Sequence, residues 1–165
     1  MTHPITCRTP RVRRLPHLLR ARAAVGVAAV LLLGACGSAV EVAPPAAADD
    51  PACAAITWPG QVAQRPRTST SPDSPATAAW ASRGAPAIVA RCGVPVPGPT
   101  RDECLGVDGV DWVARRLEDG MSFTTYGRTP AIEVLVPSAY APEPLVLSSF
   151  ASAAQTGRPT GHRCR

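Results

Sequence analysis

The feature that most constrains this chain is a short apolar segment that ends in two small residues and a cysteine. The apolar run over residues 23–33 has eleven residues, whereas a helix needs roughly 20 to cross a bilayer. Six arginines and no acidic residue precede the run, and Gly34 and Ala35 supply the small residues that a cleavage site requires. This pattern predicts a signal peptide over residues 1–35.

The segment from Leu31 to Cys36, with the sequence LLLGAC, resembles a bacterial lipobox. That resemblance implies cleavage just before Cys36 and a thioether-linked diacylglyceryl group on its sulfur. The mature protein would then be exported and held by lipid on the outer face of the cell membrane. The alternative is an uncleaved anchor helix that continues past Cys36. Pro44, Pro45 and Asp49 follow soon afterwards and argue against such a helix.

Removal of the leader changes the charge of the chain. The full sequence has 17 basic and 12 acidic residues and a formal net charge of +5. Six of the basic residues lie in the leader and every acidic residue follows Cys36, so the mature chain carries eleven basic against twelve acidic residues, a net charge of −1. This balance leaves no basic patch for nucleic acid, and we expect no nucleic-acid partner.

The mature chain has the length of one domain. Residues 36–49 are small and proline-containing, which predicts a flexible tether. Residues 50–165 then correspond to a single domain of ordinary size. Within that domain, residues 65–78 lack any large apolar side chain, which predicts an exposed, mobile loop.

The chain has six cysteines; once Cys7 is removed with the leader and Cys36 carries lipid, four are available for disulfides: Cys53, Cys92, Cys104 and Cys164. An exported domain meets an oxidising compartment, and four cysteines allow three pairings. We favour Cys92 with Cys104, which would close a short loop, and Cys53 with Cys164, which would join the two ends of the domain. Free buried thiols are the alternative. No Cys-x-x-Cys pair is present, so we expect no metal site.

A β-hairpin is the clearest local prediction. Asp-Gly at residues 108–109 stands between short apolar runs and is typical of a type I′ turn. A two-residue turn there would pair Val107 with Val110 and Leu105 with Trp112. All four side chains would then point to one face of the sheet.

The remaining elements complete an α+β pattern. Further strands are expected over residues 87–92, 122–126 and 131–136. Asp50-Pro51 predicts the start of a short helix, and the prolines at 142 and 144 predict the start of a C-terminal one. The apolar stripe of that second helix is Leu145, Val146, Ser149, Phe150 and Ala153. We therefore expect a small, mostly antiparallel sheet of about five strands, covered on one face by the C-terminal helix and braced by disulfides.

Several blocks of sequence, in order, resemble a known family. The blocks are Ala79-Trp80, Ala87-Ile88-Val89, Arg91-Cys92-Gly93-Val94, Gly109-Val110-Asp111-Trp112, Phe123-Thr124-Thr125-Tyr126-Gly127-Arg128 and residues 131–137. Together they resemble the actinobacterial exported proteins grouped as the domain-of-unknown-function family 3515. The resemblance implies an envelope location and a shared fold, and it brings no activity.

Catalysis would depend on His162, the single histidine of the mature chain, which lies two residues before Cys164. A Ser–His or Cys–His nucleophile needs a firmly held base, and only a disulfide at Cys164 would hold His162. We therefore expect no catalytic residue, no cofactor and no enzyme activity. The alternative is an envelope hydrolase or transferase that uses His162.

The best candidate binding residues are Tyr126 and Arg128, in the connection between two expected strands. An arginine at a hairpin tip can bind a carboxylate or phosphate through two parallel hydrogen bonds. The simpler interpretation is that Arg128 pairs with Asp111 or Glu133, or is merely solvated. Arg91 is expected to be structural and paired across the sheet.

Taken together, the sequence predicts a lipid-anchored envelope protein that acts as a non-catalytic interaction or ligand-binding module facing the cell wall. Its expected partner is an unidentified envelope protein or cell-wall component.

Overall fold

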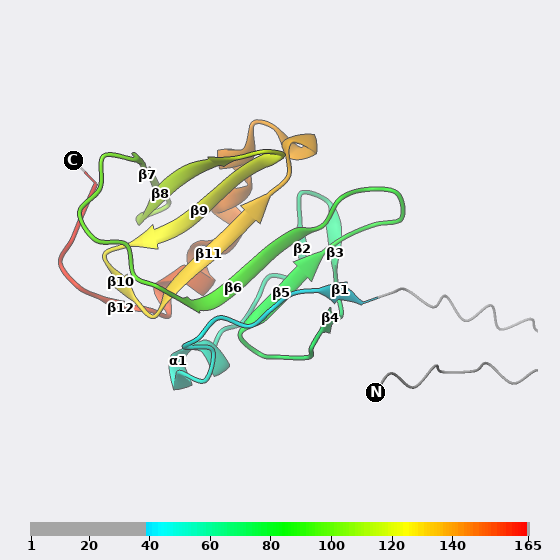
Figure 1. The fold of residues 1–165 in the computed structure, drawn as a ribbon, viewed down its shortest axis with the longest axis horizontal. Helices are drawn as coiled ribbons and strands as arrows, with labels where there is room; N and C mark the ends of the chain where they lie inside the picture. The colour runs from blue at the N-terminus through cyan, green and yellow to red at the C-terminus, as the bar shows by residue number, and fades with distance from the viewer. Residues whose placement is uncertain (1–38, 165) are drawn as a thin grey trace, which may run out of the picture. The chain divides into compact units, whose positions relative to one another are not determined.

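The computed structural model describes residues 39–164. Eight strands form one antiparallel sheet in the order β2-β3-β5-β6-β11-β9-β8-β7 (Figure 1). The sheet is therefore larger than the predicted five strands, although its antiparallel character is confirmed. The strands are β2 (Gln61–Val62), β3 (Arg65–Thr68), β5 (Thr77–Trp80), β6 (Ile88–Val94), β7 (Glu103–Val107), β8 (Val110–Leu117), β9 (Gly120–Tyr126) and β11 (Ala131–Val136).

Two short pairings lie outside this sheet. The parallel pair joins β1 (Val40–Glu41) to β4 (Thr70–Ser71), and the antiparallel pair joins β10 (Arg128–Thr129) to β12 (Arg158–Pro159). The helical segments are α1 (Pro51–Ala54), the 3₁₀ helices η1 (Ser138–Tyr140) and η2 (Glu143–Phe150), and α2 (Ala151–Gln155). In the part of the chain that the structure describes, no helix is long and apolar enough to span a membrane.

The C-terminal helical segment covers one face of the sheet, as predicted, and most of the predicted stripe is buried. Val146, Phe150 and Ala153 are buried, whereas Leu145 is 74% exposed, Ser149 is exposed, and Leu147 is buried instead. Leu147 and Phe150 share a face because residues 143–150 form a 3₁₀ helix, which has three residues per turn, so positions three apart share a face. The ring of Phe150 packs edge-on against Trp80 with 5.1 Å between ring centroids, and this contact joins helix to sheet.

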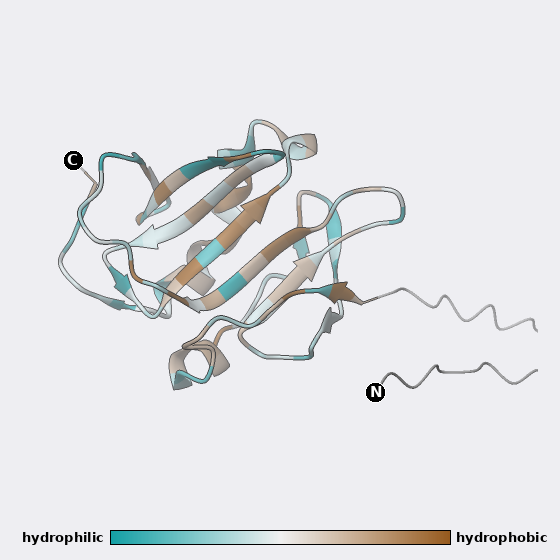
Figure 2. Cartoon of the chain, viewed as in Figure 1, coloured by the Kyte–Doolittle hydropathy of each residue, from teal (hydrophilic) through white to brown (hydrophobic). Residues whose placement is uncertain are grey.

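The two faces of the sheet differ in polarity. Figure 2 shows apolar residues alternating with polar ones along β6 and β11. Trp80 and Trp112 are fully buried on the helix-covered side. Across β6 and β11, Arg91 donates from Nε to Oε2 of Glu133 over 3.0 Å. This ion pair confirms that Arg91 is paired across the sheet.

The predicted β-hairpin is confirmed in register and turn type. Val107 pairs with Val110, and Leu105 pairs with Trp112. The two turn residues at 108–109 have φ angles of 48° and 77°, as a type I′ turn requires. The helix start is confirmed as well, because the Asp50 side chain accepts a hydrogen bond from the Ala52 amide over 2.8 Å.

Residues 65–78 are not a mobile loop, contrary to prediction. They form β3 and the start of β5, which extend the sheet beyond β6, and β4, which pairs with β1. The segment lacks large apolar residues because β3 presents mostly exposed positions, while β5 fills its buried positions with Thr77, Ala78 and Ala79 before reaching Trp80. Small side chains suffice where the neighbouring Trp58 and Trp80 rings fill the space, at 6.3 Å between centroids.

The predicted flexible tether also differs from the structure over its described part, residues 39–49. The amides of Val40 and Val42 donate to the carbonyls of Ser69 and Ser71, each over 2.9 Å, and the Val42 side chain is 4% exposed. Burial of this valine helps to fix a segment that otherwise consists mostly of alanine and proline. The predicted signal peptide, residues 1–35, and Cys36 lie outside the described residues.

All four remaining cysteines form disulfides, but the favoured pairing is wrong. Cys53 pairs with Cys92 and Cys104 with Cys164, each with 5.5 Å between Cα atoms. Cys92 lies in β6 and Cys104 in β7, and β11, β9 and β8 stand between those strands. Four strand spacings of about 4.8 Å amount to about 19 Å, far beyond the reach of one disulfide.

Candidate functional site: the C-terminal strap and its hollow

The C-terminal segment after α2 runs past β10 and along the end of the domain where β7 and β8 lie (Figure 1). We call residues 157–164 the strap. Its first half pairs as β12 with β10, and the Thr160 amide donates to the carbonyl of Gly127 over 2.8 Å. The strap is thus held by backbone hydrogen bonds at the point where β9 turns into β10.

Gly127 is the residue that permits this close approach. It has a φ angle of +68°, and a Cβ atom there would lie 2.0 Å from the carbonyl oxygen of His162. An L side chain rarely adopts that φ and would collide with the strap backbone. A glycine is therefore required where the strap passes Tyr126.

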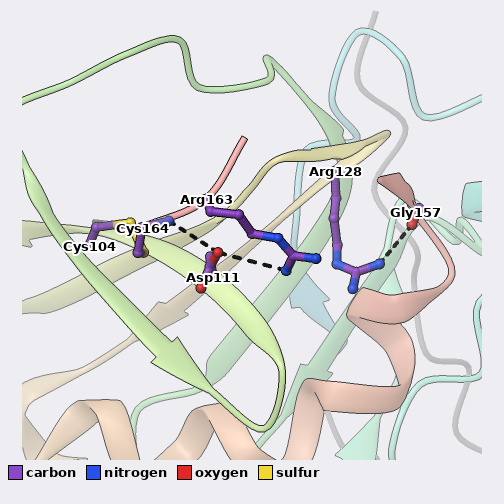
Figure 3. Close-up of polar contacts among 6 residues, drawn as sticks. All are labelled: Cys104, Asp111, Arg128, Gly157, Arg163 and Cys164. Atoms are coloured by element: carbon purple, nitrogen blue, oxygen red, sulfur yellow. Dashed lines mark hydrogen bonds and ion pairs between the residues drawn. A yellow bond between two sulfur atoms is a disulfide. The ribbon is translucent and has the colours of Figure 1, made fainter. Parts of the chain in front are cut away.

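The far end of the strap is fixed by a covalent bond and a charged acceptor (Figure 3). Cys164 forms the disulfide with Cys104 of β7. Its amide donates to Oδ2 of Asp111 over 3.1 Å, and Nη1 of Arg163 lies 3.9 Å from the same oxygen. The Asp111 carboxylate on β8 therefore accepts the hydrogen bond that holds the end of the strap.

An open hollow of about 630 Å³ lies between the strap and the loop before β7. Its lining includes Tyr126, His162 and Arg163, together with Arg101 and Asp102. The rings of Tyr126 and His162 are 5.8 Å apart between centroids and tilted by 48°. The hollow therefore combines an aromatic wall with guanidinium groups.

One carboxylate at the hollow already has a partner. Oδ2 of Asp102 accepts a hydrogen bond from Nε of Arg115 over 2.8 Å. That bond, together with a smaller contribution from Thr100, lowers the pKa of Asp102 below the ordinary value of an aspartate. Since Arg115 balances Asp102, the guanidinium of Arg101 is not offset by that neighbouring acid.

The two residues predicted as a binding pair have separate places in the structure. Tyr126 lines the hollow. Arg128 instead donates from Nη1 to the carbonyl of Gly157 over 3.0 Å, at the start of the strap (Figure 3). It pairs with neither Asp111 nor Glu133, the two partners considered for it, because those carboxylates receive other arginines.

His162 lies on an ordered segment and faces the hollow. Its Nδ1 is 3.1 Å from Oγ1 of Thr160, two residues earlier. Over residues 39–164, no group of three or more histidine, cysteine, aspartate or glutamate side chains could hold a metal ion.

Sequence reasoning missed the strap, although two signals for it were present. Gly127 follows a strand directly, where only a close backbone contact or a turn demands glycine. Cys164 lies almost at the end of the chain, which means that its disulfide must draw the preceding residues onto the domain. Neither signal says which strand receives the strap.

Comparison with known proteins gives a family and no function. The family model described as a protein of unknown function (DUF3515) matches residues 21–158. The chain belongs to the DUF3515 family. The matched range begins two residues before the apolar run at residues 23–33, includes Cys36 and ends in β12. For this DUF3515 protein, no curated protein and no solved structure gives a match.

Proposed function

We propose that this DUF3515 protein is an exported, lipid-anchored protein of the cell envelope whose domain is a non-catalytic module that binds a ligand in the hollow. Two sequence features support export and lipidation. The basic and apolar leader has the length of a signal peptide, and Cys36 follows its small residues directly. The family match also extends across this junction, from residue 21 onward.

The observation that carries the binding proposal is how firmly the strap is held around an open space. Gly127, the Cys104–Cys164 disulfide and the Asp111 carboxylate each fix one part of it. Concave sites with a few placed polar groups on a rigid scaffold are typical ligand sites. The side chains so positioned, Tyr126 and His162 among them, form a wall of the hollow rather than part of the core.

The side chains at the hollow favour a ligand with an anionic group. Arg101 and Arg163 both line it, and Nη1 of Arg163 also lies 3.9 Å from Oδ2 of Asp111. Guanidinium groups recognise carboxylates and phosphates by parallel hydrogen bonds. The ring of Tyr126 offers an adjacent flat surface for an apolar or ring-shaped part of the same ligand. We therefore propose a cell-wall component or envelope protein that presents a carboxylate or phosphate.

Binding is favoured over hydrolysis by what surrounds His162. A hydrolytic base is oriented by a carboxylate and faces a nucleophile, whereas the polar side chain within hydrogen-bond distance of its Nδ1 is the hydroxyl of Thr160. The hydrolase alternative keeps one supporting observation, which is that His162 faces the hollow. Hydrolysis of a component of envelope extracts by the wild-type protein, and its loss in the His162→Gln variant, would favour that alternative.

The binding proposal can be tested with small anions. Phosphate and acetate are titrated into the ¹⁵N-labelled mature domain while amide resonances are followed. We expect shifts centred on residues 100–102 and 161–163, and their loss in the Arg101→Gln/Arg163→Gln variant. Arg158→Gln, on an exposed position of β12 outside the hollow, is the matched control and should bind as wild type. Shifts that are absent, or that both variants reduce equally, would contradict the proposal.

A further inference from the structure

The free linker between Cys36 and the folded domain is far shorter than the composition of residues 36–49 predicts. The predicted tether runs from residue 36 to residue 49, and a free chain of that length spans up to about 45 Å. In the structure, β1 begins at Val40, and the amides of Val40 and Val42 bond to the carbonyls of Ser69 and Ser71. Only residues 37–39 then separate Cys36 from the first fixed residue.

The fixed segment is held by more than one short pairing. The Val42 side chain is 4% exposed, and the amide of Ala47 donates to the carbonyl of Gly93 over 3.3 Å. A Cβ on Gly93 would lie 2.3 Å from the carbonyl oxygen of Ala47. The chain is therefore packed on the domain from β1 to α1, and it does not act as a spacer.

The remaining link is short compared with the domain. Four residue steps, from Cys36 to Val40, cover at most about 14 Å. A domain of this length has a radius of gyration of about 14 Å and hence a diameter well above that reach. A lipid on Cys36 would therefore hold one particular end of the domain at the bilayer and would not let the domain turn freely.

The end that carries β1 lies opposite the strap. In Figure 1, β1, β3, β4 and the loop between β5 and β6 gather at one end, and β7, β10, β12 and the C-terminus lie at the other. The sheet order agrees, because β3 and β5 belong to one edge and β8 and β7 to the opposite edge.

We propose that, in the lipidated protein, the end formed by β1, β4 and the β5–β6 loop lies against the bilayer surface, so that the hollow is presented away from the membrane. This inference rests on the proposed lipidation of Cys36. This end contacts a lipid surface and not a protein, because the link from Cys36 to Val40 is too short for a partner protein to fit between the domain and the bilayer.

The contact is set by the short link more than by charge. Exposed side chains on and near these elements include Arg67 and Arg83 but also Glu41 and Asp73, so the two signs balance. Electrostatic attraction to anionic lipid would be screened at high salt. A contact imposed by the link should persist there, and this difference separates the two causes.

The test is hydrogen–deuterium exchange of the full lipidated protein in nanodiscs of phosphatidylglycerol and phosphatidylcholine, compared with the unlipidated Cys36→Ser protein in solution. We expect exchange at least about threefold slower in peptides covering residues 69–76 and 81–87, unchanged exchange at 99–104 and 158–163, and the same pattern at high salt. A variant with a 20-residue Gly/Ser insertion between Ser38 and Ala39 should lose the protection while keeping its lipid.

Two results would overturn the inference in distinguishable ways. Lipidated protein that shows no protection at residues 69–76 and 81–87, or equal protection at the strap end, contradicts the orientation alone. Protein without lipid on Cys36, shown by intact mass, removes the anchor and with it both the proposed function and this orientation.

Discussion

The carbonyl oxygen of His162 lies directly against Gly127, so close that a Cβ atom on this glycine would be 2.0 Å away. The contact joins a loop between two strands to a segment near the end of the chain. It brings Tyr126 and His162 to the same hollow, with their rings 5.8 Å apart. The candidate site therefore depends on a residue that has no side chain.

Substitution of this glycine should separate the strap from the sheet. Gly127→Ala places a side chain at a φ of +68° and against the His162 carbonyl, and we expect it to lower the free energy of unfolding by about 1–3 kcal/mol. Urea denaturation measures the change. Gly98→Ala is the control, since an added Cβ there meets no atom within 4 Å. Equal stability of the two variants would show that the strap does not pack on Gly127.

The disulfide pairing gives a second prediction. Peptide mapping of the unreduced protein should yield Cys53 linked to Cys92 and Cys104 linked to Cys164. Replacement of Cys104 and Cys164 by serine should cost about 2–4 kcal/mol of stability, because the unfolded chain loses a long closed loop. Recovery of a peptide that links Cys92 to Cys104 would contradict the strand order of the sheet.

These two predictions show where sequence reasoning stopped. The Asp108-Gly109 hairpin was predictable because a two-residue turn fixes the pairing of its own neighbours. Ile132, Val134 and Val136 alternate along the expected strand at residues 131–136, which is enough to predict a core face, and all three are buried. Such features depend only on residues close together in the chain.

Features that depend on strand order were not predictable. The chain crosses three intervening strands between β6 and β7, and nothing local to Cys92 or Cys104 records that crossing. The pairing of β1 with β4 is equally long-range. The alanines and prolines that follow β1 resemble a linker, although the Val42 side chain before them is buried. The strap that brings Arg163 to the hollow and receives Arg128 at Gly157 was likewise not foreseen.

The exposed pair of Asp102 and Arg115 gives a prediction on pH. The hydrogen bond from Arg115 lowers the pKa of Asp102 in the folded protein. The pair therefore favours the folded state above the ordinary pKa of an aspartate, and its contribution is lost as the pH falls through the lowered value. NMR titration of the Asp102 carboxyl should show the pKa rising toward the ordinary value of an aspartate in Arg115→Gln.

Two details sharpen that titration. Arg116→Gln is the matched control, because Arg116 is a neighbouring exposed arginine of β8 that is not among the groups acting on Asp102. A pKa for Asp102 that is the same in wild type and Arg115→Gln would mean that the ion pair does not form in solution.

The attachment of Arg128 to the strap is open to a direct check. Its Nη1 donates to the Gly157 carbonyl, and Arg128→Lys removes the planar donor while keeping the charge. We expect a loss of about 0.5–1.5 kcal/mol in unfolding free energy and faster amide exchange in residues 157–163. A variant that bound small anions more weakly but kept normal exchange in the strap would instead place Arg128 in the binding site.

Intact mass of the mature protein, isolated from the membranes of its own cell, is the most direct test of the central claim. We predict a chain that begins at Cys36 and carries the added mass of a diacylglyceryl group, and a Cys36→Ser variant that is released or left unprocessed. A mature chain that still contains residues 1–35, with no added mass on Cys36, would contradict it.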